Sequence, residues 1–339
     1  MTLPSLTLPE RFLPEDFVVD EIPAYEASGT GGHTFVHLEK RVRTTEELAR
    51  ALARAAEVRA ADVGYAGRKD RHAVTTQWFS VPGLDPARAL ALELPDARVL
   101  AARPHEHKLR TGHLRGNRFR ITLHAVTPED ARAAGARLEG FATRGLPNHF
   151  GRQRFGREGD NAAQGLAILR GELRLRDRRK ARFLVSALQS AVFNEALRLR
   201  PLPLDEVELG DVAVVEGSGG LFVVEDLARE SERAARFEIS ATGPLFGARS
   251  GKRDPAPTGR PSEREARALA GFGLDPAALP TPPRGLRLPG GRRPVRIRAA
   301  DAAWEFRDGD LVLVFTLPPG SYATVLLSEL VDPGALVAG

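Results

Sequence analysis

At 339 residues the chain is longer than a single hydrophobic core usually supports, so we expect two packed units. Hydrophobic residues make up 42% and charged residues 27% of the chain, values typical of globular proteins that argue against a disordered or fibrous protein. The sequence has no cysteine, which excludes disulfides, cysteine-ligated metal sites and thiol nucleophiles. It opens without a basic and apolar leader, and no segment is long and apolar enough to cross a bilayer, so we expect a cytoplasmic protein without membrane contact.

Positive charge is concentrated in three blocks, although the formal net charge is only +5. The blocks span residues 103–120, 174–182 and 284–298, and each holds six Arg or Lys side chains against at most one acid. Such blocks suit the neutralisation of phosphates. One block alone would be read as a solvated surface, whereas three favour a nucleic-acid partner.

The first third of the chain predicts a helix, a loop and a strand in that order. A helix is expected over residues 45–58, because Thr44 and Glu47 form a capping box and apolar residues recur on one face. Residues 64–71 are polar and interrupted by glycine, which indicates a loop. Residues 77–81 (QWFSV) have the composition of a strand. The loop therefore leads into a sheet.

A second strand and helix follow the first basic block. Residues 119–126 alternate between apolar and polar, as a strand buried on one face does. Thr127 and Pro128 then begin a helix that we expect to end near Gly145. Residues 146–160 are rich in Gly, Arg and aromatic residues and indicate an ordered loop.

The rest of the chain predicts a mostly helical block and then a return to strands. Ser262 with Glu265 is expected to start a short helix, and residues 281–294, rich in Pro, Gly and Arg, resemble a linker. The other expected elements are helices at 161–169, 178–198 and 321–330, a hairpin of strands 212–215 and 221–224, and strands at 295–298 and 311–316. This order indicates an α+β protein in which one domain is inserted into another, with expected bounds of 1–145, 146–290 and 291–339.

Several familiar catalytic motifs do not fit. The stretch 64–70 lacks the spacing and the Ser or Thr of a phosphate-binding P-loop, no G-x-G-x-x-G follows a predicted strand, and no G-x-S-x-G frames a serine. His105 and His107 could share a metal ion, but no third ligand lies at a suitable spacing, so we expect no metal site. Hydrolase and nucleotide-cofactor functions lose their support.

Residues 66–75 (AGRKDRHAVT) place one acid, Asp70, among three cations, Arg68, Lys69 and Arg71. These cations would favour the charged form of Asp70 if their side chains turned toward it. A lone Asp in a glycine-rich loop most often serves only to form the turn. A catalytic role for Asp70 is therefore indicated only by the motif that surrounds it.

This motif resembles the catalytic motif of the TruD family of tRNA pseudouridine synthases. Four further segments resemble the same family: 14–21 (PEDFVVDE), 108–110 with 116–119 (KLR and GNRF), 147–156 (PNHFGRQRFG) and 319–324 (PGSYAT). His149 stands where the family usually has Tyr, and Tyr322 where it often has Phe. The resemblance covers nearly the whole chain.

The resemblance implies a pseudouridine synthase core with a largely antiparallel mixed sheet, interrupted by an inserted α/β TRUD domain. It implies an enzyme that isomerises uridine 13 in the D-arm region of tRNA, with Asp70 as the catalytic aspartate. We expect no cofactor, because the isomerisation involves no redox change, and we expect a monomer. The implied uridine contacts are Phe17, Asn117, Tyr322 and Lys69, with Phe119 stacked on the base; the implied RNA contacts are Lys108, Arg110, Arg152 and Arg154.

Other interpretations stay open. Phe119 could be a core residue of its strand, Phe17 an ordinary strand residue and Asn117 an ordinary turn residue. The protein could be a non-catalytic RNA-binding protein or chaperone, which would bind as well without Asp70. A nucleosidase would need a second positioned acid and would release free base. For Asp70 itself, attack on C1′, attack on C6 and proton abstraction are all chemically reasonable.

Overall fold

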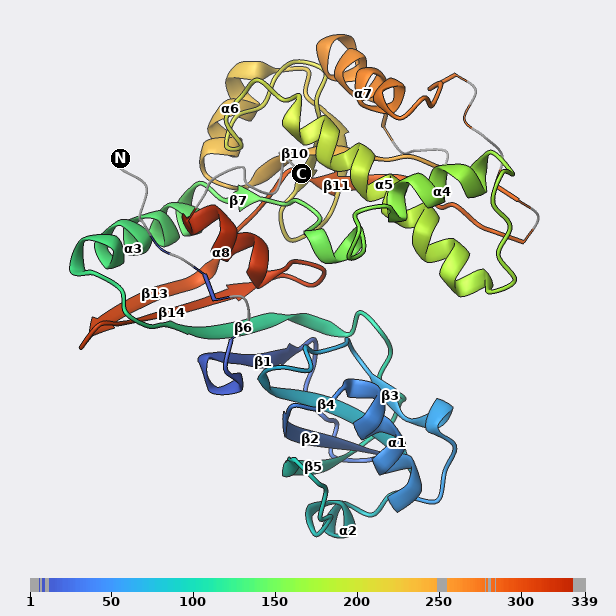
Figure 1. Ribbon diagram of the computed structural model, residues 1–339, viewed down its shortest axis with the longest axis vertical. Helices are drawn as coiled ribbons and strands as arrows, with labels where there is room; N and C mark the ends of the chain where they lie inside the picture. Colours follow the sequence, from blue (N-terminus) through green and yellow to red (C-terminus); the bar gives the residue numbers. More distant parts are fainter. Residues whose placement is uncertain are drawn as a thin grey trace. The chain divides into compact units, whose positions relative to one another are not determined.

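The computed structural model describes residues 12–248, 255–277 and 285–331, together with residues 6, 8, 9, 279, 282 and 283 (Figure 1). The contacts within the chain divide it into two compact units. Unit 1 comprises residues 1–139 and 299–320, and unit 2 comprises residues 140–298 and 321–339. Each is described by itself below.

Unit 1 is built on one eight-stranded sheet with the order β13-β14-β6-β1-β4-β2-β5, and β3 also pairs with β4 (Figure 1). Among the described strands of this sheet β1 and β4 pair in parallel, and the other neighbours are antiparallel. The expected α+β class with a largely antiparallel sheet is therefore confirmed. The strands are β1 (Phe17–Pro23), β2 (His33–Arg41), β3 (Gly64–Tyr65), β4 (Val74–Pro82), β5 (Ala97–His105), β6 (Leu114–Leu123), β13 (Ala300–Arg307) and β14 (Asp310–Leu317).

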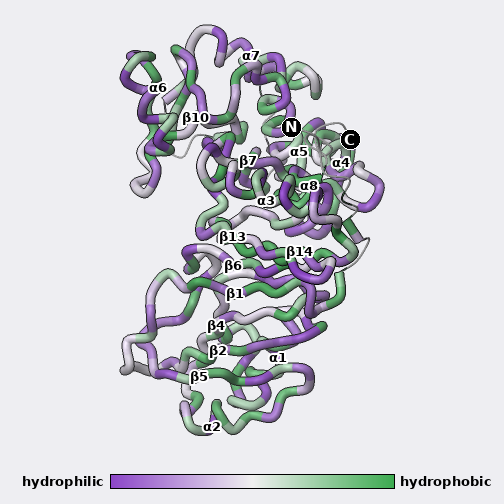
Figure 2. Tube along the Cα trace, turned by 90° about the vertical axis from the view of Figure 1, so that its left-hand side faces the viewer, coloured by the Kyte–Doolittle hydropathy of each residue, from purple (hydrophilic) through white to green (hydrophobic). Residues whose placement is uncertain are grey.

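Strand β6 shows the alternation that its sequence predicts. Phe119 and Ile121 are buried, whereas Arg118 and Arg120 are exposed. The strand differs from its predicted range at both ends, because it begins at Leu114 and stops at Leu123. Ala125 adopts a left-handed conformation, with φ of 56°, which cannot continue a strand. Strand β1 is drawn largely in green in Figure 2, in keeping with its Phe-Val-Val start.

Two helices of unit 1 begin at the caps that the sequence predicts, Thr44 and Thr127. In helix α1 (Thr45–Ala55) the Thr44 hydroxyl accepts a hydrogen bond from the Glu47 amide, and the Thr44 amide donates to the Glu47 carboxylate. The helix ends before the predicted residue 58, since Glu57 has a φ of 57°. The remaining helices are α2 (Pro86–Leu90) and α3 (Pro128–Thr143), which begins after Thr127 and whose last residues belong to unit 2.

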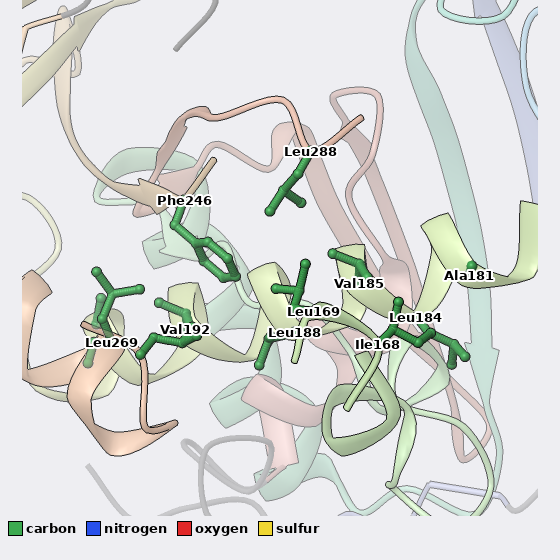
Figure 3. Close-up of a cluster of buried hydrophobic side chains, with 13 residues drawn as sticks. Ile168, Leu169, Ala181, Leu184, Val185, Leu188, Val192, Phe246, Leu269 and Leu288 are labelled. Atoms are coloured by element: carbon green, nitrogen blue, oxygen red, sulfur yellow. The ribbon is translucent and has the colours of Figure 1, made fainter. Parts of the chain in front are cut away.

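Unit 2 contains helices packed with a four-stranded antiparallel sheet of order β11-β10-β8-β9. Figure 3 shows its main core, in which buried Leu, Ile and Val side chains of α4 and α5 meet Leu269 of α7. Helices α4 and α5 and the β8–β9 hairpin follow the predictions closely. The elements are α4 (Asn161–Leu169), α5 (Arg178–Arg198), α6 (Leu227–Ala235), α7 (Gly259–Gly271), α8 (Ala323–Val331), β8 (Val212–Val215), β9 (Leu221–Val223), β10 (Ile239–Leu245) and β11 (Gly291–Pro294).

Two predictions for this unit are wrong. The end of the expected linker, Gly291–Pro294, is strand β11, which pairs with β10; residues 281 and 284 of that linker lie outside the described residues. The helix expected to start at Ser262 starts at Gly259, because Glu265 does not cap it and instead forms an ion pair with Arg292. The arginines that suggested a linker thus make tertiary contacts.

The two chain segments near the ends of residues 140–298 are joined within unit 2. A two-stranded sheet pairs β7 (Leu146–Pro147) with β12 (Arg296–Ile297). The Arg296 guanidinium is fully buried and donates to the carbonyl oxygens of Arg144, Ala234 and Ile239 at 2.9, 2.6 and 3.0 Å. Burial lowers its pKa to about 10, so it remains a cation at neutral pH.

None of the helices in the described ranges is long and apolar enough to cross a membrane.

Candidate active site around Asp70

Asp70 lies in the loop between β3 and β4, and the main chain on its N-terminal side is fixed by α1 and β4. The Lys69 amide donates to the Thr45 hydroxyl at 3.0 Å, and this hydroxyl donates to the Gln77 side-chain oxygen at 2.9 Å. The Gln77 amide group in turn donates to the Gly67 carbonyl at 3.3 Å. Asp70 itself is exposed. Its carboxylate is therefore carried on a loop whose main chain is fixed by hydrogen bonds.

The cations beside Asp70 in the sequence do not all turn toward it. The Arg68 guanidinium lies 2.6 Å from the Glu46 carboxylate. The Lys69 ammonium forms a buried ion pair with Glu21, and its side chain is only 4% exposed. Thus the expectation that neighbouring charges surround Asp70 does not hold for Arg68 and Lys69.

A second buried cation, Lys40, reaches the loop from strand β2, and the sequence did not single it out. Its ammonium donates a hydrogen bond to the main-chain carbonyl of Asp70, and the residue is 1% exposed. Burial lowers the pKa of Lys40 to about 8, and the negative charge of Asp70 acts in the opposite sense. A signal was available, since Lys40 follows Val36 and Leu38 at alternate positions of β2 and so lies on its buried face.

Glu21 connects this loop to the sheet. Its carboxylate is 1% exposed, pairs with Lys69 and accepts a hydrogen bond from the Trp78 amide at 3.1 Å. Lys69, expected to bind substrate, is therefore engaged inside the fold. Its contacts hold the catalytic-motif loop against β1 and β4.

A row of residues crosses five strands on the face that carries Lys40. Strand register places Lys40 opposite Thr75, Thr75 opposite Val19, Val19 opposite Phe119 and Phe119 opposite Phe315. Residues in such a row point to the same face of a sheet. Lys40 and Phe119 therefore share one face of the unit 1 sheet.

Two of the expected uridine contacts, Phe17 and Phe119, form an aromatic cluster there. Their ring centroids lie 6.1 Å apart in an edge-to-face arrangement, and Phe119 stacks on Phe315 at 5.4 Å. Each is 6% exposed. The sequence alone favours a core role for Phe119, whereas the resemblance implies a substrate role, and its burial gives it substantial core contacts.

Asn117, two residues before Phe119 in β6, lies on the same face and opposite Glu21. Within the described part of the chain its buried side-chain oxygen has no hydrogen-bond partner. The preceding Gly116 is required by close approach, because a Cβ there would lie 2.5 Å from the Leu317 carbonyl oxygen. The Gly-Asn pair thus brings β6 close to β14 and leaves one buried polar atom without a partner among the described residues.

The remaining expected contacts lie elsewhere. Tyr322 belongs to unit 2, and its main-chain carbonyl accepts a hydrogen bond from the Val325 amide at the start of α8. In unit 1 the Lys108 ammonium donates to the Ala61 carbonyl, and Arg110 is exposed. In unit 2 Arg152 is exposed on a short 3-10 helix.

His149, which replaces the family's usual Tyr, is a buried residue of unit 2. Burial, reinforced by the positive charge of Arg293, lowers the pKa of His149 to about 4, so it is neutral at pH 7. Its Nε2 atom lies 3.7 Å from the Glu329 carboxylate. A neutral planar ring therefore occupies this position.

Some side chains of the third basic block are buried rather than exposed at the surface. Arg292 forms an ion pair with Glu265, and Arg296 is 1% exposed among carbonyl groups. These side chains stabilise unit 2, so the nucleic-acid interpretation of this block is wrong for them. In the part of the chain that the structure describes, no group of three His, Cys, Asp or Glu side chains could hold a metal ion.

Comparison with known proteins identifies the family. The sequence profile of the family described as tRNA pseudouridine synthase D (TruD) matches residues 11–176 and 174–330. The tRNA pseudouridine synthase D of Geobacter metallireducens is 37% identical over 94% of this chain and 93% of its own length. That of an Anaeromyxobacter species is 43% identical over 94% and 90%, and that of Thermus thermophilus 42% identical over 94% and 87%.

A solved structure supports the same fold. The structure of a tRNA pseudouridine synthase D (TruD) from Methanosarcina mazei matches with a TM-score of 0.72 at 24% sequence identity, over 94% of this chain and 92% of that one. Because the motifs, the sequence relatives and the fold agree, the resemblance inferred from five segments is confirmed. The chain belongs to the TruD family of tRNA pseudouridine synthases.

Proposed function

We propose that the protein converts uridine 13 of tRNA to pseudouridine and that Asp70 is its catalytic carboxylate. The observation that carries the proposal is the environment of Asp70. Its side chain is exposed on a loop that Thr45, Gln77 and the Lys69–Glu21 ion pair anchor, with the ammonium of Lys40 at its main chain. Anchoring of this kind provides the fixed geometry that a reacting group needs.

The reaction requires only bond exchange within one nucleotide. The N1–C1′ bond breaks, the uracil turns within the site, and a C5–C1′ bond forms; C5 loses one proton and N1 gains one. A carboxylate can serve this sequence by attacking C1′ or C6, or by accepting the proton. No electron is gained or lost overall, so we propose that no cofactor takes part.

Lys40 would support Asp70 in two ways. Its positive charge stabilises the carboxylate by attraction, and its hydrogen bond to the Asp70 carbonyl fixes the residue's main chain. Lys69 would act on the same loop through Glu21 rather than by touching the base. We therefore assign both lysines positioning roles.

The target base must leave its stack in the folded tRNA and be held by flat and polar groups. Phe17, Phe119 and Tyr322 are the aromatic residues that we propose as contacts of the base. The Asn117 side-chain oxygen, which has no hydrogen-bond partner among the described residues, would accept a hydrogen bond from the uracil imide N–H. Lys108, Arg110, Arg152 and Arg154 would contribute to RNA binding.

The proposal also covers the domain organisation, the oligomeric state and the cellular location of the protein. We propose that residues 146–290 form a TRUD domain inserted into a catalytic core made of residues 1–145 and 291–339. The protein would act on tRNA as a monomer in the cytoplasm. Neither a membrane nor a second subunit is needed for the chemistry.

Asp70→Asn tests the assignment directly. We expect this variant to keep its fold and its tRNA affinity but to form no pseudouridine, because an amide neither attacks nor accepts a proton as a carboxylate does. Nucleoside analysis of a labelled tRNA transcript measures the product, and a transcript with cytidine at position 13 tests the site of modification. Turnover near that of wild type would remove Asp70 from the mechanism.

Asp308→Asn is the matched control. Asp308 is another exposed aspartate of unit 1, in the β13–β14 turn, and its φ of 53° suits Asn equally well. We expect this variant to retain normal turnover. A non-catalytic RNA-binding protein would show no difference between the two variants.

A further inference from the structure

The first turns of helix α5 and the segment before it carry six positive side chains and one acid, Asp177. We call this surface the α5 basic surface; its members, all exposed, are Arg174, Arg176, Arg178, Arg179, Lys180 and Arg182. Leu173 and Leu175 alternate with the first two of them and pack against the unit 2 core, which directs the arginines outward. Within the described residues, no side-chain nitrogen of any member forms an ion pair within 4.0 Å of a carboxylate.

These cations do not stabilise the helix that carries them. Positive side chains in the first turn of a helix oppose the positive end of its dipole and are mildly destabilising. The single acid of the block, Asp177, is used as the N-cap, where its carboxylate accepts from the amides of Arg179 and Lys180 at 2.8 and 3.1 Å. The charge is therefore explained better by an anionic ligand than by the needs of the fold.

An exposed aromatic ring follows the basic surface directly. Phe183 is 42% exposed, and the Arg154 guanidinium lies 4.9 Å from the centroid of its ring. Arg154 is held in place by the hydroxyls of Ser186 at 2.6 Å and Ser190 at 3.2 Å, one turn apart on α5. In the described chain no carboxylate lies within 4.0 Å of Arg154, so this cation too lacks a counter-charge.

We infer that Phe183 and the α5 basic surface form a second RNA contact, separate from the uridine site. Phe183 stacks on an unpaired base of the tRNA, and the surrounding cations bind the adjacent phosphates. An aromatic face within a basic surface is the usual combination for binding unpaired nucleotides, and it tolerates any base because every base offers a flat face. The identity of the RNA as tRNA rests on the proposed function.

We expect substitution of Phe183 to weaken tRNA binding without slowing the chemical step. Phe183→Ala should weaken tRNA binding roughly ten- to hundred-fold, the amount that one base stack contributes. KM should rise accordingly while kcat at saturating tRNA stays unchanged. Phe183→Trp should restore binding, and the melting temperature should change little, because the ring lies at the surface and loses mainly its contact with Arg154.

Leu227→Ala is the matched control, since Leu227 is 40% exposed near the start of another helix of unit 2. It should bind tRNA like the wild type. The double variant Arg179→Gln, Arg182→Gln should lower the slope of log affinity against log salt by about 1 to 2, as expected when one or two phosphate contacts are lost. A chemical footprint should show a base, other than uridine 13, that wild type protects and Phe183→Ala does not.

The outcomes separate this inference from the proposed function. Failure of Asp70→Asn to stop turnover would overturn the catalytic assignment and leave the binding result standing. Unchanged tRNA affinity in Phe183→Ala would overturn the second contact even if wild type makes pseudouridine. Self-association that disappears in Phe183→Ala, with RNA affinity intact, would instead assign the ring to a protein interface and also overturn it.

Discussion

Replacement of Lys40 by Met tests whether a buried cation supports Asp70. The side chain is 1% exposed, and its ammonium donates to the Asp70 carbonyl. Met has a similar length and shape but neither charge nor donor. We expect turnover to fall at least ten-fold, since a hydrogen bond from a charged group contributes roughly 1.5–3 kcal/mol to the position of its acceptor.

The same substitution should not weaken the fold at neutral pH. The pKa of Lys40 is lowered from 10.5 to about 8, so holding the charged form inside the protein costs roughly 3 kcal/mol at 1.36 kcal/mol per unit. Met removes this cost, although the hydrogen bond to the loop is lost with it. The two changes offset each other in part, and we expect a free energy of unfolding at pH 7 equal to or above that of wild type.

The lowered pKa of Lys40 also predicts how the free energy of unfolding changes with pH. Between about pH 8 and pH 10.5 the unfolded chain binds the Lys40 proton and the folded chain does not, so this residue raises the stability of wild type as pH rises through that range. Lys40→Met should lack the rise. Urea unfolding at pH 7 and pH 9.5, with turnover measured on the same preparations, tests both effects. A variant with normal turnover and the wild-type pH dependence of stability would refute the reasoning.

Three further predictions follow from other contacts. Phe119→Ala should lower the free energy of unfolding by roughly 3–5 kcal/mol, because the ring is 6% exposed and stacks on Phe315; an unchanged urea midpoint would place Phe119 outside the core. Hydrogen bonds to Asp310 and Asp16 raise the pKa of His124 above 6.5, so the stability it contributes should be full below pH 6.5 and lost as pH rises through the raised value. His124→Gln should remove this part of the pH dependence, and identical profiles for variant and wild type would count against it. Exhaustive chelation should leave turnover on a pre-folded tRNA unchanged, and a loss that zinc or another transition metal reverses would reveal a missed metal site.

Local signals predicted the elements whose formation depends on nearby residues. The capping box of Thr44 and Glu47 starts α1, and the patterns over α4 and α5 gave their bounds because apolar periodicity there reflects one buried face. Strand β2 was missed because its apolar periodicity is interrupted. Val36 and Leu38 alternate with polar residues in it, but Lys40 occupies the next buried position and ends the apolar alternation.

In the candidate site, too, the local motif could be predicted from the sequence, whereas contacts between distant residues could not. The motif around Asp70 was recognisable, but the partners of its neighbours were not, because Lys69 pairs with Glu21 from another strand and Arg68 with Glu46 from a helix. Lys40 reaches the loop from thirty positions earlier in the chain. Contacts of this kind are set by strand order and register, which sequence periodicity does not encode.

The buried guanidinium of Arg296 has a consequence for the order in which the protein folds. Strands β6 and β14 are neighbours in the unit 1 sheet, with Leu123 opposite Leu311, although most of unit 2 lies between them in the chain. Pairing them across a flexible chain of that length would be slow, because distant contacts must form after a large loop has closed. Arg296 and the β7–β12 pair fasten the two ends of that intervening segment to each other. Once unit 2 has folded, the effective loop that β14 must close is short, and completion of the central sheet becomes nearly a local event.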